Sequence, residues 1–402
     1  MNDPARQTLV DGLEDGDLKR ELGWRAQPAP PQPLAVKHAV PLVFGGTGAA
    51  YFRVWVVNLL LTLVTLGVYS AWAKVRKARW FAQHTSLAGD RFDFHGDPLR
   101  ILLGRAVALL LLLAWTWGFR FSLWLGLGVL LLFCIAGPAL FASAQRFKLA
   151  NTSWRGLRFG FEAPRHSVYL VCVPLLLLWT AGSVLQAADA PVSLLLASSG
   201  LLLVCMPWAH ARLKRLQHGH ARFGAQPFSM QPATAGFYAL YAKASGLLLV
   251  GGLLAALPIG LYAVLMRNAS ARSEPLPDNF MLPLLAGLGA VLILWLVVWP
   301  YFAARLQQLV WGRTRWGGVQ FRSTMRSAVL WRLVLVNMLL VLLTAGLYWP
   351  FAAVAVARYR VQSLTVESDE PLADVQTSLP PAVEKRSVGD GAADFFGLDL
   401  GW

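Results

Sequence analysis

Eight long apolar runs constrain this chain more than any other feature of its sequence. Stretches such as 109–113 and 175–178 are apolar on every face of a helix, which places a helix in lipid or at the centre of a large core. Eight consecutive runs cannot all lie at the centre of one core. Because a spanning helix needs about 20 apolar residues, we expect an all-α polytopic membrane protein with about eight transmembrane helices. The runs cover residues 51–70, 100–117, 121–141, 167–187, 191–209, 243–266, 281–304 and 328–349.

The charged residues are few and unevenly placed. They make up 14% of the chain, against about 25% in a soluble domain. The net charge of +15 would suggest nucleic acid in a soluble protein, but here the basic residues follow apolar runs. That pattern favours the lipid bilayer and its anionic headgroups as partners. We expect no nucleic-acid partner; the sequence identifies no protein partner and is compatible with a homo-oligomer.

Both ends of the chain differ from the middle. Residues 1–43 are polar and rich in proline, and residues 367–402 are again polar, so we expect two disordered tails around a membrane domain at 44–366. His210, His218 and His220 match no known metal-ligand spacing. The three cysteines lie in apolar runs and are expected to be packing residues. The sequence therefore predicts no metal site, no cofactor and no catalytic residues.

One internal repeat relates the first apolar run to the last. Aligning Asn58 with Asn337 requires no gap over the following 25 residues, which makes a chance match improbable. The alignment also pairs Thr65 with Thr344, Gly67 with Gly346, Tyr69 with Tyr348, Trp72 with Phe351, Arg79 with Arg358, and Gln83 with Gln362.

A second repeated element follows several of the runs. Residues 84–92, 151–159 and 313–321 share a Thr, a Gly and a Phe at matching positions, while the copies at 220–230 and 363–370 are degenerate. A glycine within a short alternation of polar and apolar residues is typical of a turn between two strands. We expect small β-hairpins outside the membrane, joined to the spans by basic amphipathic helices. The repeat units lie near 44–98, 99–165, 166–231, 232–325 and 326–366.

The stretch from F-G-G-T-G-A-A-Y-F-R at 44–53, through L-V-T-L-G-V-Y-S-A-W-A at 63–73, to R-F-D-F-H-G-D-P at 91–98 resembles the YjgN family of bacterial inner-membrane proteins. The repeat copy at 333–360 is similar to the carboxy-terminal half of the same family, and the resemblance covers about 44–366. It implies a multi-pass protein of the bacterial inner membrane. It supplies no catalytic residues, and the copy at 220–230 departs from the pattern.

The basic residues also predict orientation. Lys and Arg are concentrated in the connections that hold the hairpins, so the hairpins should be cytoplasmic. With eight full spans, however, both tails would then lie outside. As an alternative, runs 51–70 and 328–349 could each break near Thr-x-Gly-x-Tyr and return to the side they entered. Re-entrant backbone of this kind has to be buried in protein or line a water-filled cavity.

Eight residues form a candidate polar site in the membrane. Asn58 and Asn337 lie inside apolar runs, and two explanations fit them: a shared midplane site of a repeat-built transporter, or hydrogen bonds that fix helix packing. The small residues of the repeat fit both. The candidate residues are Asn58, Thr65, Gly67, Tyr69, Asn337, Thr344, Gly346 and Tyr348.

A basic and aromatic cluster follows the first run. It either contacts anionic lipid headgroups or only sets the topology. Its residues are Trp72, Lys74, Arg76, Lys77 and Arg79.

Two function classes remain open. One is a transporter or channel for a small or lipidic solute. The other is a structural or interaction protein whose basic cytoplasmic hairpins bind anionic lipid or a partner protein. We do not expect an enzyme, because no set of catalytic side chains lies within reach of one another in the sequence.

Overall fold

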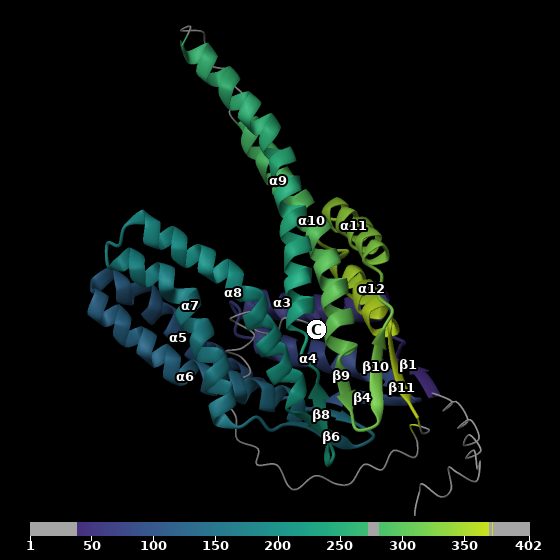
Figure 1. Cartoon of the computed structure of the whole chain (residues 1–402). Coiled ribbons are helices and arrows are strands. Elements are labelled where there is room, and N and C mark those ends of the chain that lie inside the picture. The colour runs from purple at the N-terminus through teal and green to yellow at the C-terminus, as the bar shows by residue number, and fades with distance from the viewer. Residues whose placement is uncertain (1–37, 272–280, 370–371, 373–402) are drawn as a thin grey trace, which may run out of the picture. The chain divides into compact units, whose positions relative to one another are not determined.

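A computed structural model describes residues 38–271, 281–369 and Leu372. The predictions for 1–37 and for most of 367–402 fall outside the described residues. Within them, helices come in pairs, and each pair begins and ends at a β-strand (Figure 1).

Three of the pairs are long. Asp97 accepts a hydrogen bond from the Leu99 N–H at the start of the first, and Ser122 accepts one from the Trp124 N–H where its second helix begins, as expected for N-cap residues. All six helices contain a segment long and apolar enough to cross a membrane. They are α5 (Pro98–Phe121), α6 (Leu123–Ala150), α7 (Arg165–Ala187), α8 (Val192–Gly219), α9 (Thr234–Ala271) and α10 (Met281–Trp311).

Two further pairs are short, so the prediction of about eight spanning helices is not confirmed. Runs 51–70 and 328–349 reach spanning length only when counted across a sharp turn. The structure breaks each run at that turn, where the alternative of broken helices placed it. The short pairs are α3 (Gly48–Val64) with α4 (Ser70–Gln83), and α11 (Ser327–Leu343) with α12 (Trp349–Gln362).

The predicted basic amphipathic helices exist as separate elements only in these short pairs, as α4 and α12. In the long pairs, α6, α8 and α10 continue without a break into the basic stretch. Each does so through an internal proline, at Pro138, Pro207 and Pro300. A proline ends a helix only when the freed carbonyl and the bulk of its ring cannot be accommodated. Here proline marks the boundary in the sequence but does not end the helix.

Short strands between the helical pairs form β-hairpins. The three predicted hairpins are confirmed, and the degenerate copy at 220–230 forms a fourth with strands of the same lengths. Ala88 and Gly89 both have positive φ, as do Arg155 and Gly156, which is typical of two-residue hairpin turns. The strands are β3 (Thr85–Leu87), β4 (Asp90–Phe94), β5 (Thr152–Trp154), β6 (Leu157–Phe161), β7 (Ala221–Phe223), β8 (Gln226–Met230), β9 (Thr314–Trp316) and β10 (Val319–Ser323).

The hairpins join edge to edge in one eleven-stranded sheet, which the sequence did not predict. Its order is β1-β11-β10-β9-β8-β7-β6-β5-β4-β3-β2. The last strand, β11 (Leu364–Ser368), pairs with β1 (His38–Pro41), and β2 (Val43–Phe44) pairs with β3. Because only Leu42 separates β1 from β2, the segment 38–44 pairs with both edges and closes the sheet on itself. The expected end of the amino-terminal tail at residue 43 is therefore wrong, since these residues are strands.

The sheet has an aromatic core. Side chains from every hairpin share it, and Leu372, four residues beyond β11, is buried in it. Leu372 lies beyond the predicted end of the membrane domain at 366. Neighbouring rings stack, for example Phe92 on Trp154 and Phe228 on Trp316. Its buried members are Leu87, Trp154, Phe223, Trp316, Val319, Val366 and Leu372.

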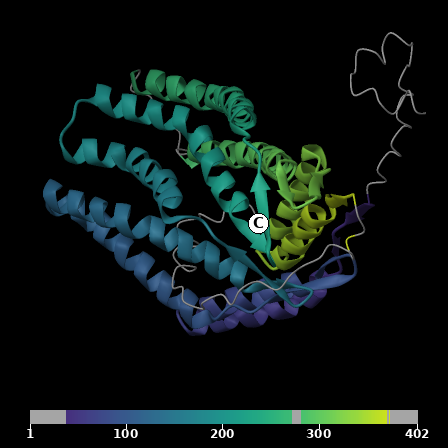
Figure 2. The same ribbon diagram turned by 60° about the horizontal axis from the view of Figure 1, so that its bottom comes forward.

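The helical pairs contact one another in chain order. Helix α4 contacts α5, α6 contacts α7, α8 contacts α9, and α10 contacts α11. Contacts between α12 and α3 join the last pair to the first. Figure 2 shows the paired helices from a second side. Both ends of every helical pair lie at the sheet. The two ends of the domain, at β1 and β11, therefore lie on the same side of the helices.

Candidate functional site

Two matching turns hold six of the eight candidate polar residues. Helix α3 ends at Val64, and the chain turns back through residues 65–69 into α4. Leu66 has φ 49° and Gly67 φ 94°; in the second copy Ala345 has φ 48° and Gly346 φ 93°. Left-handed backbone of this kind favours glycine. The repeated glycine is therefore explained by the turn.

The repeated threonine and tyrosine belong to the same turn. The Thr65 hydroxyl donates to Leu61 O at 2.7 Å and accepts from the Tyr69 N–H at 2.9 Å. The Thr344 hydroxyl makes the same two bonds in the second copy, at 2.7 and 3.0 Å. One hydroxyl thereby joins the end of the first helix to the start of the second.

Each tyrosine stacks on the aromatic residue three positions later. Tyr69 and Trp72 have ring centroids 6.1 Å apart and nearly parallel planes, and Tyr348 and Phe351 lie at 5.1 Å. Trp72, predicted as a lipid contact, is half-buried against α5. These rings stiffen the first turn of α4 and α12.

Asn58 and Asn337 are both buried, at 7% and 8% exposure. Each forms its hydrogen bond within its own helical hairpin, which is α3–α4 for Asn58 and α11–α12 for Asn337. Asn58 Oδ1 accepts a long hydrogen bond of 3.5 Å from Arg76 Nη1 on α4. Asn337 Nδ2 donates to Leu333 O, one turn back in its own helix, at 2.7 Å. These contacts fit the packing explanation. They do not join the two asparagines into one site.

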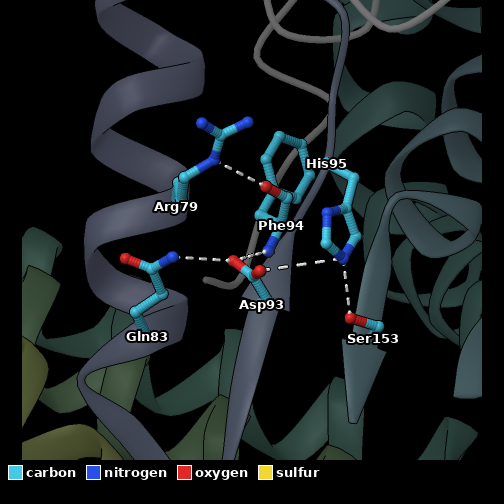
Figure 3. Close-up of polar contacts among 6 residues, drawn as sticks. All are labelled: Arg79, Gln83, Asp93, Phe94, His95 and Ser153. Atoms are coloured by element: carbon cyan, nitrogen blue, oxygen red, sulfur yellow. Dashed lines mark hydrogen bonds and ion pairs between the residues drawn. The ribbon is translucent and has the colours of Figure 1, made fainter. Parts of the chain in front are cut away.

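Arg79 lies in a network that connects α4 to the sheet. Figure 3 shows Arg79 and Gln83 extending from α4 toward β4. Arg79 Nε donates to Phe94 O at 3.0 Å, and Gln83 Nε2 donates to Asp93 Oδ1 at 3.1 Å. His95, just after β4, contacts the Ser153 hydroxyl of β5 at 3.0 Å. This arrangement gives Arg79 a structural role.

The other basic residues of α4 are placed differently. Arg76 and Lys77 are exposed and Lys74 is half-buried. The Arg76 guanidinium also lies 6.0 Å from the centre of the Tyr69 ring, within cation–π range. Three cations therefore follow the turn within two helical turns.

Comparison of α12 with α4 shows which basic residues of α4 the helical hairpin needs. Arg358, which aligns with Arg79, also bonds a backbone carbonyl near the end of a strand: its Nη2 donates to Gly46 O, two residues after β2, at 2.7 Å. The positions aligned with the three other cations are uncharged. Lys74 corresponds to Ala353, Arg76 to Ala355 and Lys77 to Val356. The helical hairpin therefore forms without those three charges.

Two further polar contacts between helices involve residues outside the repeat. Arg105 of α5 donates from Nη1 to the Ser70 hydroxyl at 2.6 Å, next to the first turn. His210 of α8 is buried, and its Nδ1 lies 3.0 Å from the Tyr241 hydroxyl of α9. The sequence signal was only a charged or polar residue within an apolar run. Among the described residues, no group of three or more His, Cys, Asp or Glu side chains is arranged to hold a metal ion.

Comparison with known proteins identifies a family. Residues 39–395 match the model of a family described as "Bacterial protein of unknown function (DUF898)". The inner membrane protein YjgN of Escherichia coli O157:H7 is 29% identical over 142 residues, which are 35% of each chain. YjgN of Salmonella typhimurium strain LT2 is 26% identical over 147 residues, 35% of this chain and 36% of that protein. The aligned parts thus span about a third of these curated relatives. No solved structure matches the chain.

Proposed function

The chain belongs to the DUF898 family, and from that premise we propose that it is an inner-membrane protein whose sheet faces the cytoplasm and whose helix α4 binds anionic lipid headgroups. The resemblance to the YjgN family is confirmed, and the named relatives are inner membrane proteins. The role proposed is that of a lipid-bound platform without catalytic activity.

The observation that carries the proposal is the charge difference between α4 and α12. Both helices follow the same turn and both keep an arginine that bonds a backbone carbonyl near the end of a strand. Only α4 adds Lys74, Arg76 and Lys77, where α12 has Ala353, Ala355 and Val356. Charges that the second copy of this hairpin lacks, placed directly behind an apolar turn, suit the boundary between acyl chains and headgroups. Each such charge contributes about 1 kcal/mol of attraction to an anionic surface.

Charge on the other helices supports the orientation. The connections at the far ends of α5–α6 and α7–α8 hold Arg120 and Asp189. The ends that meet the sheet are much more basic, and Lys and Arg are retained on the cytoplasmic side. Exposed cations at the sheet ends of the helices include Arg76, Lys77, Arg146, Arg165, Arg212, Arg215, Arg305 and Arg326.

The proposal is tested by measuring which lipids remain with the protein. The full chain is extracted in polymer-bounded nanodiscs from vesicles of phosphatidylcholine and phosphatidylglycerol, and the retained lipid is quantified by mass spectrometry. We expect enrichment of phosphatidylglycerol over the bulk membrane. The triple variant Lys74→Ala/Arg76→Ala/Lys77→Ala should lose this enrichment, with affinity for the anionic lipid falling by up to about 100-fold.

A control variant of equal charge separates the site from net charge. Arg91, Arg158 and Arg315 are exposed on strands β4, β6 and β9, so replacing all three with Ala removes the same charge elsewhere. The control should keep the enrichment. Equal enrichment in wild type and the α4 variant, or equal loss in both variants, would refute a headgroup site on α4.

Transport through a polar site shared by the two repeats stays a prediction. Its support would be a joint site of Asn58 and Asn337, whereas each bonds within its own hairpin. Solute flux into proteoliposomes, compared between wild type and Asn58→Leu/Asn337→Leu, tests it directly. Flux that is equal in both, at the level of empty liposomes, would remove this role.

A further inference from the structure

We infer that the hairpins α3–α4 and α11–α12 form a half-depth wedge whose turns lie among acyl chains of the leaflet on the sheet side. The surface is the pair of apolar tips at residues 63–68 and 342–347, and its partner is lipid acyl chain. This inference does not rest on the binding of anionic headgroups, because a wedge inserts into neutral lipid as well.

The uncharged arms of the hairpins are too short to cross a membrane. In the first hairpin no charged residue lies between Arg53 and Lys74, and in the second none lies between Arg332 and Arg358. The longest arms, 54–66 and 333–345, extend about 20 Å as helix. The hydrocarbon core is about 30 Å thick. Each arm therefore ends inside the core when its charged end stays at the headgroups.

The turns leave no backbone N–H group without an acceptor. At the tip, Leu66 N–H donates to Leu63 O and Gly67 N–H to Thr62 O, at 3.1 and 2.8 Å. The next three N–H groups also bond within the turn. Those of Val68, Tyr69 and Ser70 donate to Thr65 O, the Thr65 hydroxyl and Gly67 O, respectively. An unsatisfied N–H costs several kcal/mol in hydrocarbon, which is why re-entrant backbone ordinarily needs burial in protein or a water-filled cavity. Every N–H of this turn already has an acceptor within the helical hairpin, so the turn enters acyl chains without that cost.

The second turn repeats the same bonds. Ala345 N–H donates to Leu342 O at 3.2 Å and Gly346 N–H to Val341 O at 2.8 Å, and Leu347 N–H donates to Thr344 O at 3.1 Å. Two copies of one self-satisfied turn, in segments about 280 residues apart in the sequence, indicate a common environment.

The tip side chains are apolar and uncovered. Leu66 is 95% exposed and Leu343 is 83% exposed, with Val64 and Leu347 also exposed. Water at these positions would face a bare apolar surface at the end of each hairpin. Acyl chains remove that cost at about 25 cal/mol for each Å² covered.

The two hairpins are neighbours, because α12 contacts α3. They therefore form one continuous sector of the ring of helices, between the long pair α9–α10 and the long pair α5–α6. Over this sector only the leaflet on the sheet side is occupied by protein. The ends of the acyl chains of the opposite leaflet then contact the hairpin tips.

The inference is tested by labelling single cysteines in the full chain. Cys134, Cys172 and Cys205 are first replaced by Ala, and one cysteine is introduced as Leu66→Cys or Leu343→Cys. Ser122→Cys, between α5 and α6, and Arg91→Cys, on β4, report the two sides of the membrane. A membrane-impermeant maleimide should label one reporter in intact cells and the other in inverted vesicles. The two tip cysteines should be labelled at least about tenfold more slowly from both sides.

Depth is measured independently. A fluorophore attached to the tip cysteine in detergent, before reconstitution, should be quenched more by lipids carrying a nitroxide on the acyl chain than by lipids carrying it on the headgroup. Tip cysteines that react as fast as Ser122→Cys from its side would show a full crossing. Tip cysteines that react as fast as Arg91→Cys from its side, or are quenched best from the headgroup, would show a hairpin outside the core. Either result overturns the wedge. Loss of phosphatidylglycerol enrichment alone would not.

Discussion

At the residue scale, the repeat shows which side chains serve the turn. Thr65 and Thr344 share one hydroxyl geometry, and Gly67 and Gly346 share one φ value, although their hairpins differ in charge. From the sequence alone, two interpretations of these residues were possible, because a small residue in an apolar run suits both helix packing and a binding site. Only the backbone angles distinguish the two, and no sequence pattern reports them directly.

Replacing a turn glycine tests this role. Gly67→Ala places a Cβ at φ 94°, so the variant should be destabilised by about 1–2 kcal/mol although the space around the new Cβ is open. Thermal denaturation in detergent should show a Tm lower by about 1–2 °C for each kcal/mol lost. Gly128→Ala is the matched control, because Gly128 lies within α6 and also has open space around it. It should be neutral or slightly stabilising, and equal effects of the two changes would contradict the turn's role.

The contact between His210 and Tyr241 leads to a second expectation. His210 Nε2 is buried and has no hydrogen-bond partner among the described residues, so the Tyr241 hydroxyl is the partner the structure gives to this ring. Tyr241→Phe leaves both ring nitrogens unsatisfied, and a buried unsatisfied group costs about 1–3 kcal/mol. The Tm of Tyr241→Phe should fall below that of Tyr238→Phe, which removes an exposed hydroxyl that bonds Val204 O at 3.0 Å and leaves no buried ring nitrogen unsatisfied. Equal Tm values would show that His210 does not depend on this contact.

At the scale of elements, the sequence predicted the pieces better than their assembly. Three hairpins followed from a shared Thr, Gly and Phe. Their union did not, since Phe92 pairs with Trp154 across a helical pair of more than 50 residues, and pairing at that distance leaves no periodic signal. The strand at 38–44 was missed for a related reason: so short a segment becomes a strand only because both of its neighbours offer free edges.

Closure of the sheet can be tested at Leu42. Its N–H donates to Leu364 O at 3.0 Å, and Leu42→Pro removes that donor between β1 and β2. We expect a lower Tm and faster proteolysis within the strands, because an opened sheet exposes the aromatic core. Val43→Thr is the control, since Val43 is half exposed and the change keeps its N–H. If Leu42→Pro were as stable and as resistant as Val43→Thr, the closing strand would not contribute to stability.

At the scale of the whole molecule, helical pairs that return to the sheet remove the conflict between orientation and span number. Eight full spans with cytoplasmic hairpins forced both tails outside. Six long helices and two short hairpins place β1 and β11 at the sheet instead. The count of eight is not confirmed because length was measured along residues, and a turn with positive φ does not interrupt an apolar run.

Topology reporters should agree with this arrangement. A reporter fused at the carboxy terminus and another inserted at Gly89 should report the same side, which we expect to be the cytoplasm. A reporter inserted at Ser122 should report the periplasm. Alkaline phosphatase and green fluorescent protein fusions give opposite signals on the two sides. A periplasmic carboxy terminus combined with a cytoplasmic Gly89 would mean an odd number of membrane crossings between these two points. That result would contradict helices that cross in pairs.

The pairing of β1 with β11 has a consequence for biosynthesis. Strand β1 leaves the ribosome early, but its partner at 364–368 is made some 325 residues later. At about 5–20 residues per second, the first strand waits roughly 15 to 65 s with an open edge while the helices are inserted. A chain cut short anywhere before residue 364 keeps that edge unpaired. Completion of the ring thus distinguishes full-length products from aborted ones, because only a chain that reaches β11 covers the edge of β1.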